Sequence, residues 1–110
     1  MVYFVGAGPG AADLITVRGM RLLEQADVVI YAGSLVNPEL LSYCKKECEI
    51  HNSAYMTLEE VLAVMEEAEK QKLTTVRLHT GEPSIYGAVR EQMDLLDEKG
   101  ILYESCQIGR

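Results

Sequence analysis

The chain has 110 residues, of which 48% are hydrophobic and 25% charged, a composition typical of a globular domain with a single core. Its 17 acidic and 10 basic residues give a formal charge of -7, which argues against a nucleic-acid surface because phosphate binding needs a basic footprint. No apolar run reaches bilayer length, and no signal-peptide pattern opens the chain. We therefore expect a cytoplasmic protein without membrane contact.

The three cysteines are an odd number and do not suggest the disulfide framework of a secreted protein. The spacing of Cys44, Cys48 and His51 is compatible with a metal site. However, no C-x-x-C pair and no second ligand pair is present to complete a tetrahedral site. We interpret these cysteines as buried or half-buried thiols and predict no metal.

The first half of the chain predicts a strand, a helix, a strand, a helix and a weak strand, at 2–5, 16–26, 27–31, 38–46 and 48–52. Thr16 can cap the first helix. Its apolar side comprises Val17, Met20, Leu23 and Ala26. Asn37 can cap the second helix, with Pro38 in the favoured first helical position.

The second half predicts a helix, a strand, a helix and a strand, at 57–71, 74–79, 84–99 and 101–105. Thr57 and Glu60 have the spacing of a capping box. Gly100 stands where a glycine ends a helix.

This alternation of strands and helices predicts an α/β fold, a three-layer domain with a mainly parallel five-stranded sheet. The ligand site of such a domain lies beyond the carboxyl ends of the strands. Two loops with unusual composition leave those ends, GAGPGAAD after the first strand and HTGEPSIYG after the fourth. The pair is the most informative feature of the sequence.

In the first loop, Gly6, Gly8 and Ala11 match the dinucleotide spacing G-x-G-x-x-G/A. A dinucleotide site also needs a helix that starts within the motif and an acid at the end of the second strand. The helix start is delayed to Thr16, and no acid occurs after that strand before Glu39. The sequence therefore disfavours NAD or FAD, and a glycine turn without a ligand stays open as an alternative.

The second loop favours a ligand without identifying it. Gly81 lets a ligand approach the backbone, Pro83 fixes the turn and Ser84 can cap the next helix. Glu82 could pair with an amine or a sulfonium, or could simply face water.

Together the loops resemble the tetrapyrrole methylase family, S-adenosylmethionine-dependent enzymes of cobalamin and sirohaem synthesis. VGAGPGAADLITVRG is similar to the opening segment of the family, and VRLHTGEPSIYGAVREQM is similar to its R(L)xxGDPxxYG segment. The second segment is closest to precorrin-4 C11-methyltransferases, and ADVVIYAGSLV and SAYMTLEEV also match their patterns. The likeness runs from residue 1 to about residue 104.

The resemblance implies S-adenosyl-L-methionine as the cofactor and a precorrin as the substrate. By this resemblance the cofactor would be bound by Pro9, Thr80, Gly81, Glu82, Ile85 and Tyr86. The glycine-rich loop would face the tetrapyrrole, and our substrate-binding candidates are Gly8, Gly10, Asp13 and Arg18. Substrate carboxylates also need cations, for which Arg77 and Arg90 are further candidates beside surface charge or internal ion pairing.

The implied reaction is methyl transfer to C11 of precorrin-4 or cobalt-precorrin-4, and the catalytic residues stay unknown. Tyr31, Tyr86 and Glu82 could assist proton removal, and none stands out. The chain departs from the family pattern in three places. Ala11 replaces an Asp for which Asp13 could substitute, Glu82 replaces an Asp, and Gly33 stands where relatives often carry an acid.

Relatives of this family continue into a second α/β domain that completes the cofactor cleft. We therefore expect residues 1–110 to form the N-terminal domain of such an enzyme and to be inactive alone. The alternatives are another tetrapyrrole methyltransferase, or a stand-alone ligand-binding module that assembles as a homodimer.

Overall fold

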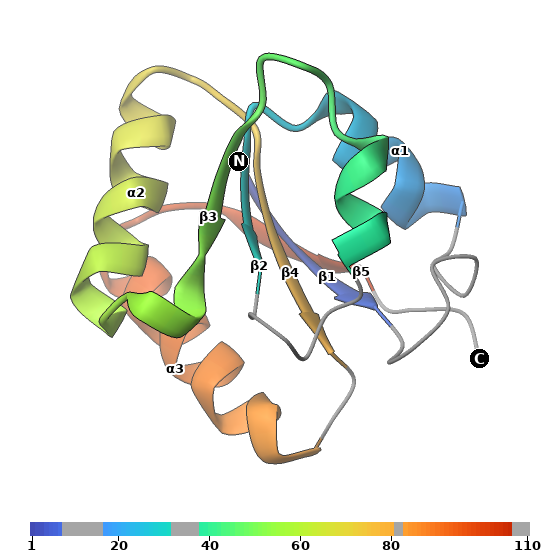
Figure 1. Cartoon of the computed structure of the whole chain (residues 1–110). Coiled ribbons are helices and arrows are strands. Elements are labelled where there is room, and N and C mark those ends of the chain that lie inside the picture. The colour runs from blue at the N-terminus through green and yellow to red at the C-terminus, as the bar shows by residue number, and fades with distance from the viewer. Residues whose placement is uncertain (8–16, 32–37, 81–82, 107–110) are drawn as a thin grey trace.

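The computed structural model describes residues 1–7, 17–31, 38–80 and 83–106 (Figure 1). Its strands are β1 (Val2–Ala7), β2 (Val28–Tyr31), β3 (Glu49–Asn52), β4 (Thr75–Thr80) and β5 (Tyr103–Cys106). Its α-helices are α1 (Val17–Gln25), α2 (Leu58–Lys70) and α3 (Pro83–Glu98), and two 3-10 helices are η3 (Pro38–Tyr43) and η4 (Ser53–Tyr55).

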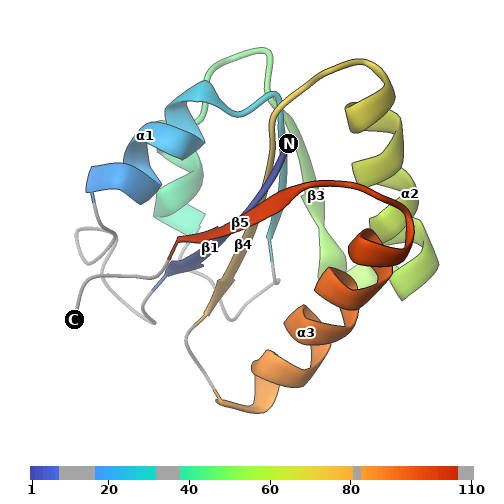
Figure 2. The same ribbon diagram turned by 180° about the vertical axis from the view of Figure 1, so that it is seen from behind.

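The five strands form one sheet in the order β3-β2-β4-β1-β5, and every pairing is parallel. Helix α1 and η3 cover one face, whereas α2 and α3 cover the other, as Figures 1 and 2 show from opposite sides. The connections from β1 to β2 and from β2 to β3 step toward the β3 edge and run over one face. The connections from β3 to β4 and from β4 to β5 step toward the β5 edge and run over the other, as right-handed crossovers require. The predicted three-layer α/β domain is confirmed.

Alternation along the strands divides the core into two layers. Val2 and Phe4 of β1 join the cluster under α2 and α3, together with Met65 and Leu96 of those helices. Val5 of the same strand joins the cluster under α1 and η3. Buried strands with apolar residues on both faces are typical of parallel sheets covered by helices.

The predicted α2 and its capping box are confirmed. The backbone N–H of Glu60 donates to Oγ1 of Thr57 at 3.2 Å, and the N–H of Thr57 donates to Oε1 of Glu60 at 2.9 Å. These bonds satisfy two N–H groups that the first helical turn leaves open.

Four predicted boundaries need correction. The first strand, expected over 2–5, extends to Ala7. The helix expected over 38–46 is the shorter 3-10 helix η3, just after which the Cys44 N–H bonds the Leu41 carbonyl three residues back at 3.1 Å. Helix α3 begins at Pro83, a good first helical residue, so Ser84 lies inside the helix and does not cap it. The last strand begins two residues later than expected, at Tyr103. The expected caps Thr16 and Asn37 lie outside the described residues.

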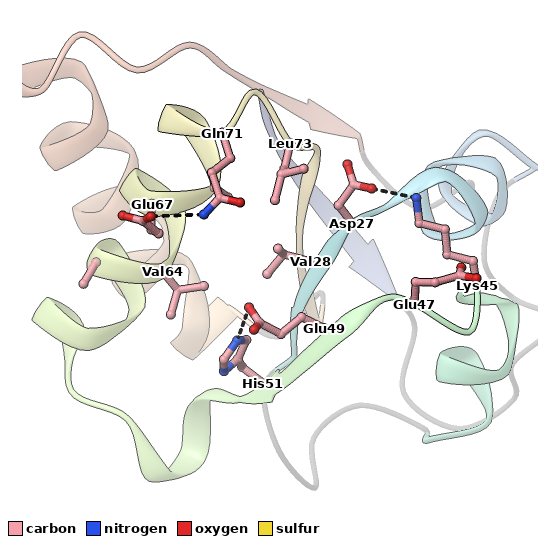
Figure 3. Close-up of a pocket in the computed structure, with 12 residues that line it drawn as sticks. Asp27, Val28, Lys45, Glu47, Glu49, His51, Val64, Glu67, Gln71 and Leu73 are labelled. Atoms are coloured by element: carbon pink, nitrogen blue, oxygen red, sulfur yellow. Dashed lines mark hydrogen bonds and ion pairs between the residues drawn. The ribbon is translucent and has the colours of Figure 1, made fainter.

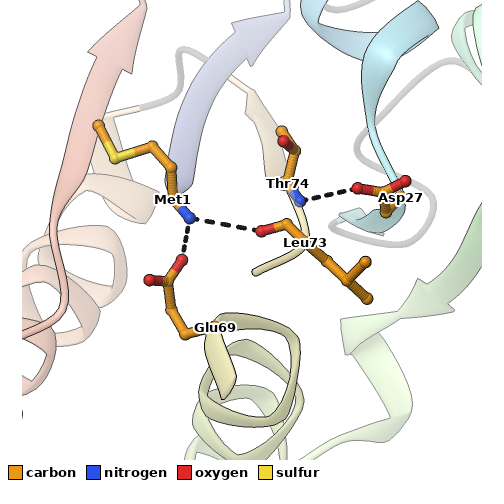
Figure 4. Close-up of polar contacts among 5 residues, drawn as sticks. All are labelled: Met1, Asp27, Glu69, Leu73 and Thr74. Carbon is orange, nitrogen blue, oxygen red and sulfur yellow. Dashed lines mark hydrogen bonds and ion pairs between the residues drawn. The ribbon is translucent and has the colours of Figure 1, made fainter. Parts of the chain in front are cut away.

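The amino ends of the strands are tied together around the turn before β4 (Figure 4). Asp27 N–H donates to the Thr74 carbonyl at 2.9 Å, and Thr74 N–H donates to Oδ2 of Asp27 at 2.9 Å. The Met1 ammonium contacts the Glu69 carboxylate and donates to the Leu73 carbonyl. The turn is thus held to β1, β2 and α2.

Helices α2 and α3 end with equivalent backbone hydrogen bonds, one at each helix. Leu73 N–H bonds the Ala68 carbonyl at 2.8 Å, and Ile101 N–H bonds the Leu96 carbonyl at 2.9 Å. This arrangement requires a residue with positive φ just after the helix. At α3 that residue is Gly100, with φ 71°, as predicted; at α2 it is Lys72, with φ 60°.

Replacing Lys72 with glycine should stabilise the domain by about 0.5 to 1 kcal/mol, because a side chain is unfavourable at positive φ. Gly100→Ala should destabilise it by about 1 kcal/mol for the same reason. No atom of the described residues lies within 4 Å of an added Cβ, so the positive φ alone opposes the side chain. Urea unfolding measures both changes. Lys70→Gly, inside α2, is the control and should destabilise; a gain there would show that the benefit does not come from φ.

Thr75 is fully buried in β4, and its Oγ1 has no hydrogen-bond partner among the residues that the structure describes. Thr75→Val keeps the shape and removes the unsatisfied hydroxyl, so the free energy of unfolding should rise by about 1 kcal/mol. Thr74→Val, at the half-buried neighbouring position, should change it by less than about 0.5 kcal/mol. A loss of stability in Thr75→Val would contradict this account of the hydroxyl.

Candidate functional site

The ends of β1 and β4 bring the two sequence motifs to adjacent positions. The strands are neighbours in the sheet, and Ala7, the last residue of β1, pairs with Thr80, the last residue of β4. The two strand ends from which the motifs continue are therefore adjacent at the carboxyl edge of the sheet. Gly6, the first glycine of the motif, is a strand residue paired with His79.

These strand ends also mark the place where the chain changes faces. After β1 it continues to α1 on one face, and after β4 to α3 on the other (Figure 2). Such a switch point, at the carboxyl ends of adjacent parallel strands, is where open α/β sheets bind ligands.

Three predicted cofactor-binding residues fall on described backbone. Thr80 ends β4, and Ile85 and Tyr86 belong to the first turn of α3. The structure thus brings their backbones to the switch point. The other candidates, namely Gly8, Pro9, Gly10, Asp13, Gly81 and Glu82, lie outside the described residues, as do Ala11 and Gly33.

The candidate arginines differ in their surroundings. The Arg18 guanidinium on α1 donates to Glu104 of β5 at 3.0 Å, and its side chain is 62% exposed. Arg90 pairs with Asp94 one turn further along α3 at 3.4 Å. Both remain accessible to an anionic ligand.

The prediction that Arg77 meets a substrate carboxylate is wrong. The residue is 6% exposed and lies under α3, where it bonds Gln92 and two backbone carbonyls. The sequence could have predicted this burial from the position of Arg77 in the strand, because a buried central strand directs Thr75, Arg77 and His79 to one covered face. Gln92 was also missed, although it shares a helical face with Val89 and Leu96.

Tyr31, a candidate for proton removal, ends β2 at the same edge. Its side chain is half-buried against the core cluster under α1 and η3. Its carbonyl accepts a hydrogen bond from Oγ of Ser53 at 3.0 Å, which joins β2 to η4.

A groove of about 600 Å³ runs between β3 and α2 (Figure 3). Val28, Val64 and Leu73 supply apolar lining. Six of the polar residues around it form pairs: Lys45 with Asp27 at 2.6 Å, His51 with Glu49 at 2.9 Å and Gln71 with Glu67 at 3.0 Å. None of the predicted cofactor- or substrate-binding residues that the structure describes lines this groove.

Cys44 and Cys48 are free and half-buried, as expected. Burial raises the pKa of both thiols, and the neighbouring Cys44 contributes to raising the pKa of Cys48 to about 12. Both therefore stay protonated near neutral pH, which disfavours a role as nucleophile or metal ligand. Within the described part of the chain, no group of three or more His, Cys, Asp or Glu side chains could hold a metal ion.

The fold and the switch point place the chain in a class: parallel α/β domains, whose ligand sites generally lie beyond the carboxyl ends of adjacent strands. The sequence profile of the tetrapyrrole (corrin/porphyrin) methylases matches residues 1–105. The chain therefore belongs to the tetrapyrrole methylase family, and the resemblance in the two motifs is confirmed.

Known relatives include enzymes named for precorrin-4. The chain is 59% identical over 100 residues to a cobalt-precorrin-4 C(11)-methyltransferase of Methanocaldococcus jannaschii, covering 91% of this chain and 39% of the relative. It is 47% identical to a precorrin-4 C(11)-methyltransferase of Rhodococcus erythropolis, covering 94% and 41%. The chain thus spans about two fifths of the length of these relatives.

Solved structures share the fold. The X-ray structure of a cobalt precorrin-4 methyltransferase superimposes with a TM-score of 0.87 at 47% identity, covering 94% of this chain and 44% of that one. A uroporphyrin-III C-methyltransferase of Thermus thermophilus, complexed with S-adenosylhomocysteine, gives a TM-score of 0.75 at 31% identity, covering 96% and 43%. No helix in the described ranges has the length and apolar character needed to cross a membrane.

Asp27, at the rim of the groove, has a lowered pKa because its carboxylate accepts hydrogen bonds from Lys45 and from the Thr74 N–H. A depressed carboxyl pKa stabilises the fold above the unfolded value of about 4, and the contribution is lost as the pH falls through the folded value. Asp27→Asn should therefore lower the free energy of unfolding by about 1 kcal/mol at pH 7.

The difference in the free energy of unfolding between Asp27→Asn and the unmodified chain should become smaller towards pH 3. Urea unfolding at several pH values measures it, with Glu47→Gln, another carboxyl of the groove, as the control. An equal difference at pH 3 and pH 7 would contradict the argument that the lowered pKa of Asp27 contributes to stability.

Proposed function

We propose that this chain is the S-adenosylmethionine-binding domain of a methyltransferase that acts on C11 of precorrin-4 or cobalt-precorrin-4. The observation that carries the proposal is the 59% identity to a relative of that name, together with the pairing of Ala7 with Thr80, which brings the two motif-bearing strands to one edge of the sheet. We also propose that the protein works in the cytoplasm and that it can assemble as a homodimer.

The described edge of the sheet suits the proposed cofactor. Its strand ends carry the uncharged residues Ala7, Tyr31 and Thr80, and the first turn of α3 follows closely after β4. A site that contacts its ligand mainly through backbone groups needs such open strand ends and helix starts. We assign cofactor contacts to Pro9, Gly81 and Glu82 together with the backbones of Thr80, Ile85 and Tyr86.

When bound, the cofactor supplies an electrophilic methyl group on a sulfonium, so the reaction needs no protein nucleophile. The protein's task is to align the acceptor carbon with that methyl group and to exclude water. In this proposal Arg18 attracts a substrate carboxylate, because its guanidinium is exposed beside the single carboxylate of Glu104. The segment with Gly8, Gly10 and Asp13 faces the tetrapyrrole.

A second candidate is another tetrapyrrole methyltransferase. The chain is 42% identical over 110 residues to a uroporphyrinogen-III C-methyltransferase of Bacillus subtilis, covering 94% of this chain and 23% of the relative. We prefer precorrin-4 or cobalt-precorrin-4 as the substrate because several enzymes named for them are 47% to 59% identical to this chain. Assaying the parent protein with both tetrapyrroles would separate the two candidates.

Calorimetric titration of the chain with S-adenosylhomocysteine, with NAD as the control ligand, tests the cofactor assignment. We expect binding of the first ligand and none of the second. Gly81→Val should weaken binding at least about tenfold, because a side chain would stand where the ligand approaches the backbone. Gly100→Ala, at the opposite end of α3, should leave the affinity unchanged.

Binding of NAD in place of S-adenosylhomocysteine would overturn the cofactor assignment. A chain that binds neither ligand would overturn the proposal that this domain holds the cofactor by itself.

A further inference from the structure

The central strand β4 carries a buried polar row through an otherwise apolar layer. Thr75, Arg77 and His79 alternate with Val76 and Leu78, and all five residues are buried. In the sheet, Arg77 is flanked in register by Phe4 of β1 and Ile30 of β2. A guanidinium therefore occupies a position where both neighbouring strands place a large apolar side chain.

Arg77 connects three elements. Its Nε donates to Oε1 of Gln92 on α3 at 3.1 Å. Its Nη1 donates to the Ile30 carbonyl of β2 and to the Leu78 carbonyl of β4, each at 3.3 Å. Burial lowers the pKa of Arg77 to about 10, so the side chain remains charged at neutral pH.

Stability alone does not account for an arginine at this position. No carboxylate within the described ranges forms an ion pair with it. Burying a charge without an opposite charge is unfavourable, and apolar side chains of similar size often replace buried ions without loss of stability. A flexible apolar side chain such as methionine would suit the surrounding layer at least as well.

The contacts lie close to the carboxyl edge. Ile30 precedes Tyr31, the last residue of β2, and Leu78 lies two residues before the end of β4. The planar guanidinium donates in fixed directions, so its bonds set the spacing of the two strand ends and their position against α3. The segment 81–82, to which the proposed function assigns cofactor contacts, joins β4 to α3.

We propose that Arg77 is a positioning residue: it holds the ends of β2 and β4 and the helix α3 in the arrangement in which the backbones of Thr80, Ile85 and Tyr86 contact the cofactor. This inference rests on the proposed function for the identity of the ligand. Arg77 acts through the strand ends and has no contact with the ligand.

The test compares Arg77→Met and Arg77→Lys with Thr75→Val, which removes a buried polar group from the same strand face two residues further from the edge. Three quantities are measured for each chain: the urea midpoint of unfolding, the affinity for S-adenosylhomocysteine, and the amide hydrogen exchange of residues 30–31 and 78–80. Exchange of residues 2–5 in β1 is the internal reference.

We expect Arg77→Met to keep or raise the urea midpoint while its affinity falls at least tenfold and exchange at both strand ends accelerates. Arg77→Lys keeps the charge but loses the fixed directions of the guanidinium, so it should not restore the affinity. Thr75→Val should keep the affinity of the unmodified chain.

An affinity within twofold of the unmodified chain for Arg77→Met, or unchanged exchange at the strand ends, would overturn the proposal. A full rescue by Arg77→Lys would also overturn it, because charge alone would then suffice. If the unmodified chain does not bind S-adenosylhomocysteine, the proposal that this domain holds the cofactor by itself fails, and the exchange rates still decide whether Arg77 holds the strand ends.

Discussion

The parallel pairing of β1 with β4 is the constraint on which the rest of the structure depends. It joins the first strand to the fourth over six residue pairs, from Val2 with Thr75 to Ala7 with Thr80. With β4 inserted between β1 and β2, α1 must cross one face of the sheet while α2 and α3 cover the other. The same pairing places the two motifs at one edge, so the fold and the candidate site have a common origin.

Much of this architecture could be predicted because local physics determines it. The capping box of Thr57 and Glu60 and the glycine after α3 are signals contained within a few residues, and both occur as predicted. The strand order is different, since alternation of strands and helices predicts a parallel sheet without showing that β4 separates β1 from β2. Helix η3 was predicted as a longer helix because Pro38 marks a start, while nothing local fixes whether the turns that follow are α or 3-10.

The candidate site was predictable in its location and less so in its cations. The motif positions identified the family and the edge of the sheet, whereas Arg77 was a candidate for the substrate, beside surface charge or internal ion pairing, from its charge alone. Its alternation with Val76 and Leu78 places it inside the protein, and the partner Gln92 comes from a helix that follows β4. Charge indicates what a residue could bind, and periodicity indicates whether a ligand can reach it.

The sheet order has a consequence for synthesis of the chain. Both partners of β1, which are β4 and β5, come from the second half of the sequence, while β2 and β3 are close neighbours along the chain. As the polypeptide leaves the ribosome, β2 and β3 can therefore pair early, but β1 must wait until residues 75–80 have emerged. During that interval Val2, Phe4 and Val5, which are buried in the finished domain, have no strand beside them. Strand β1 is thus made before the other four strands but is paired only after β4 has emerged, and a nascent chain that stops before β4 leaves the apolar residues of β1 open to association with other chains.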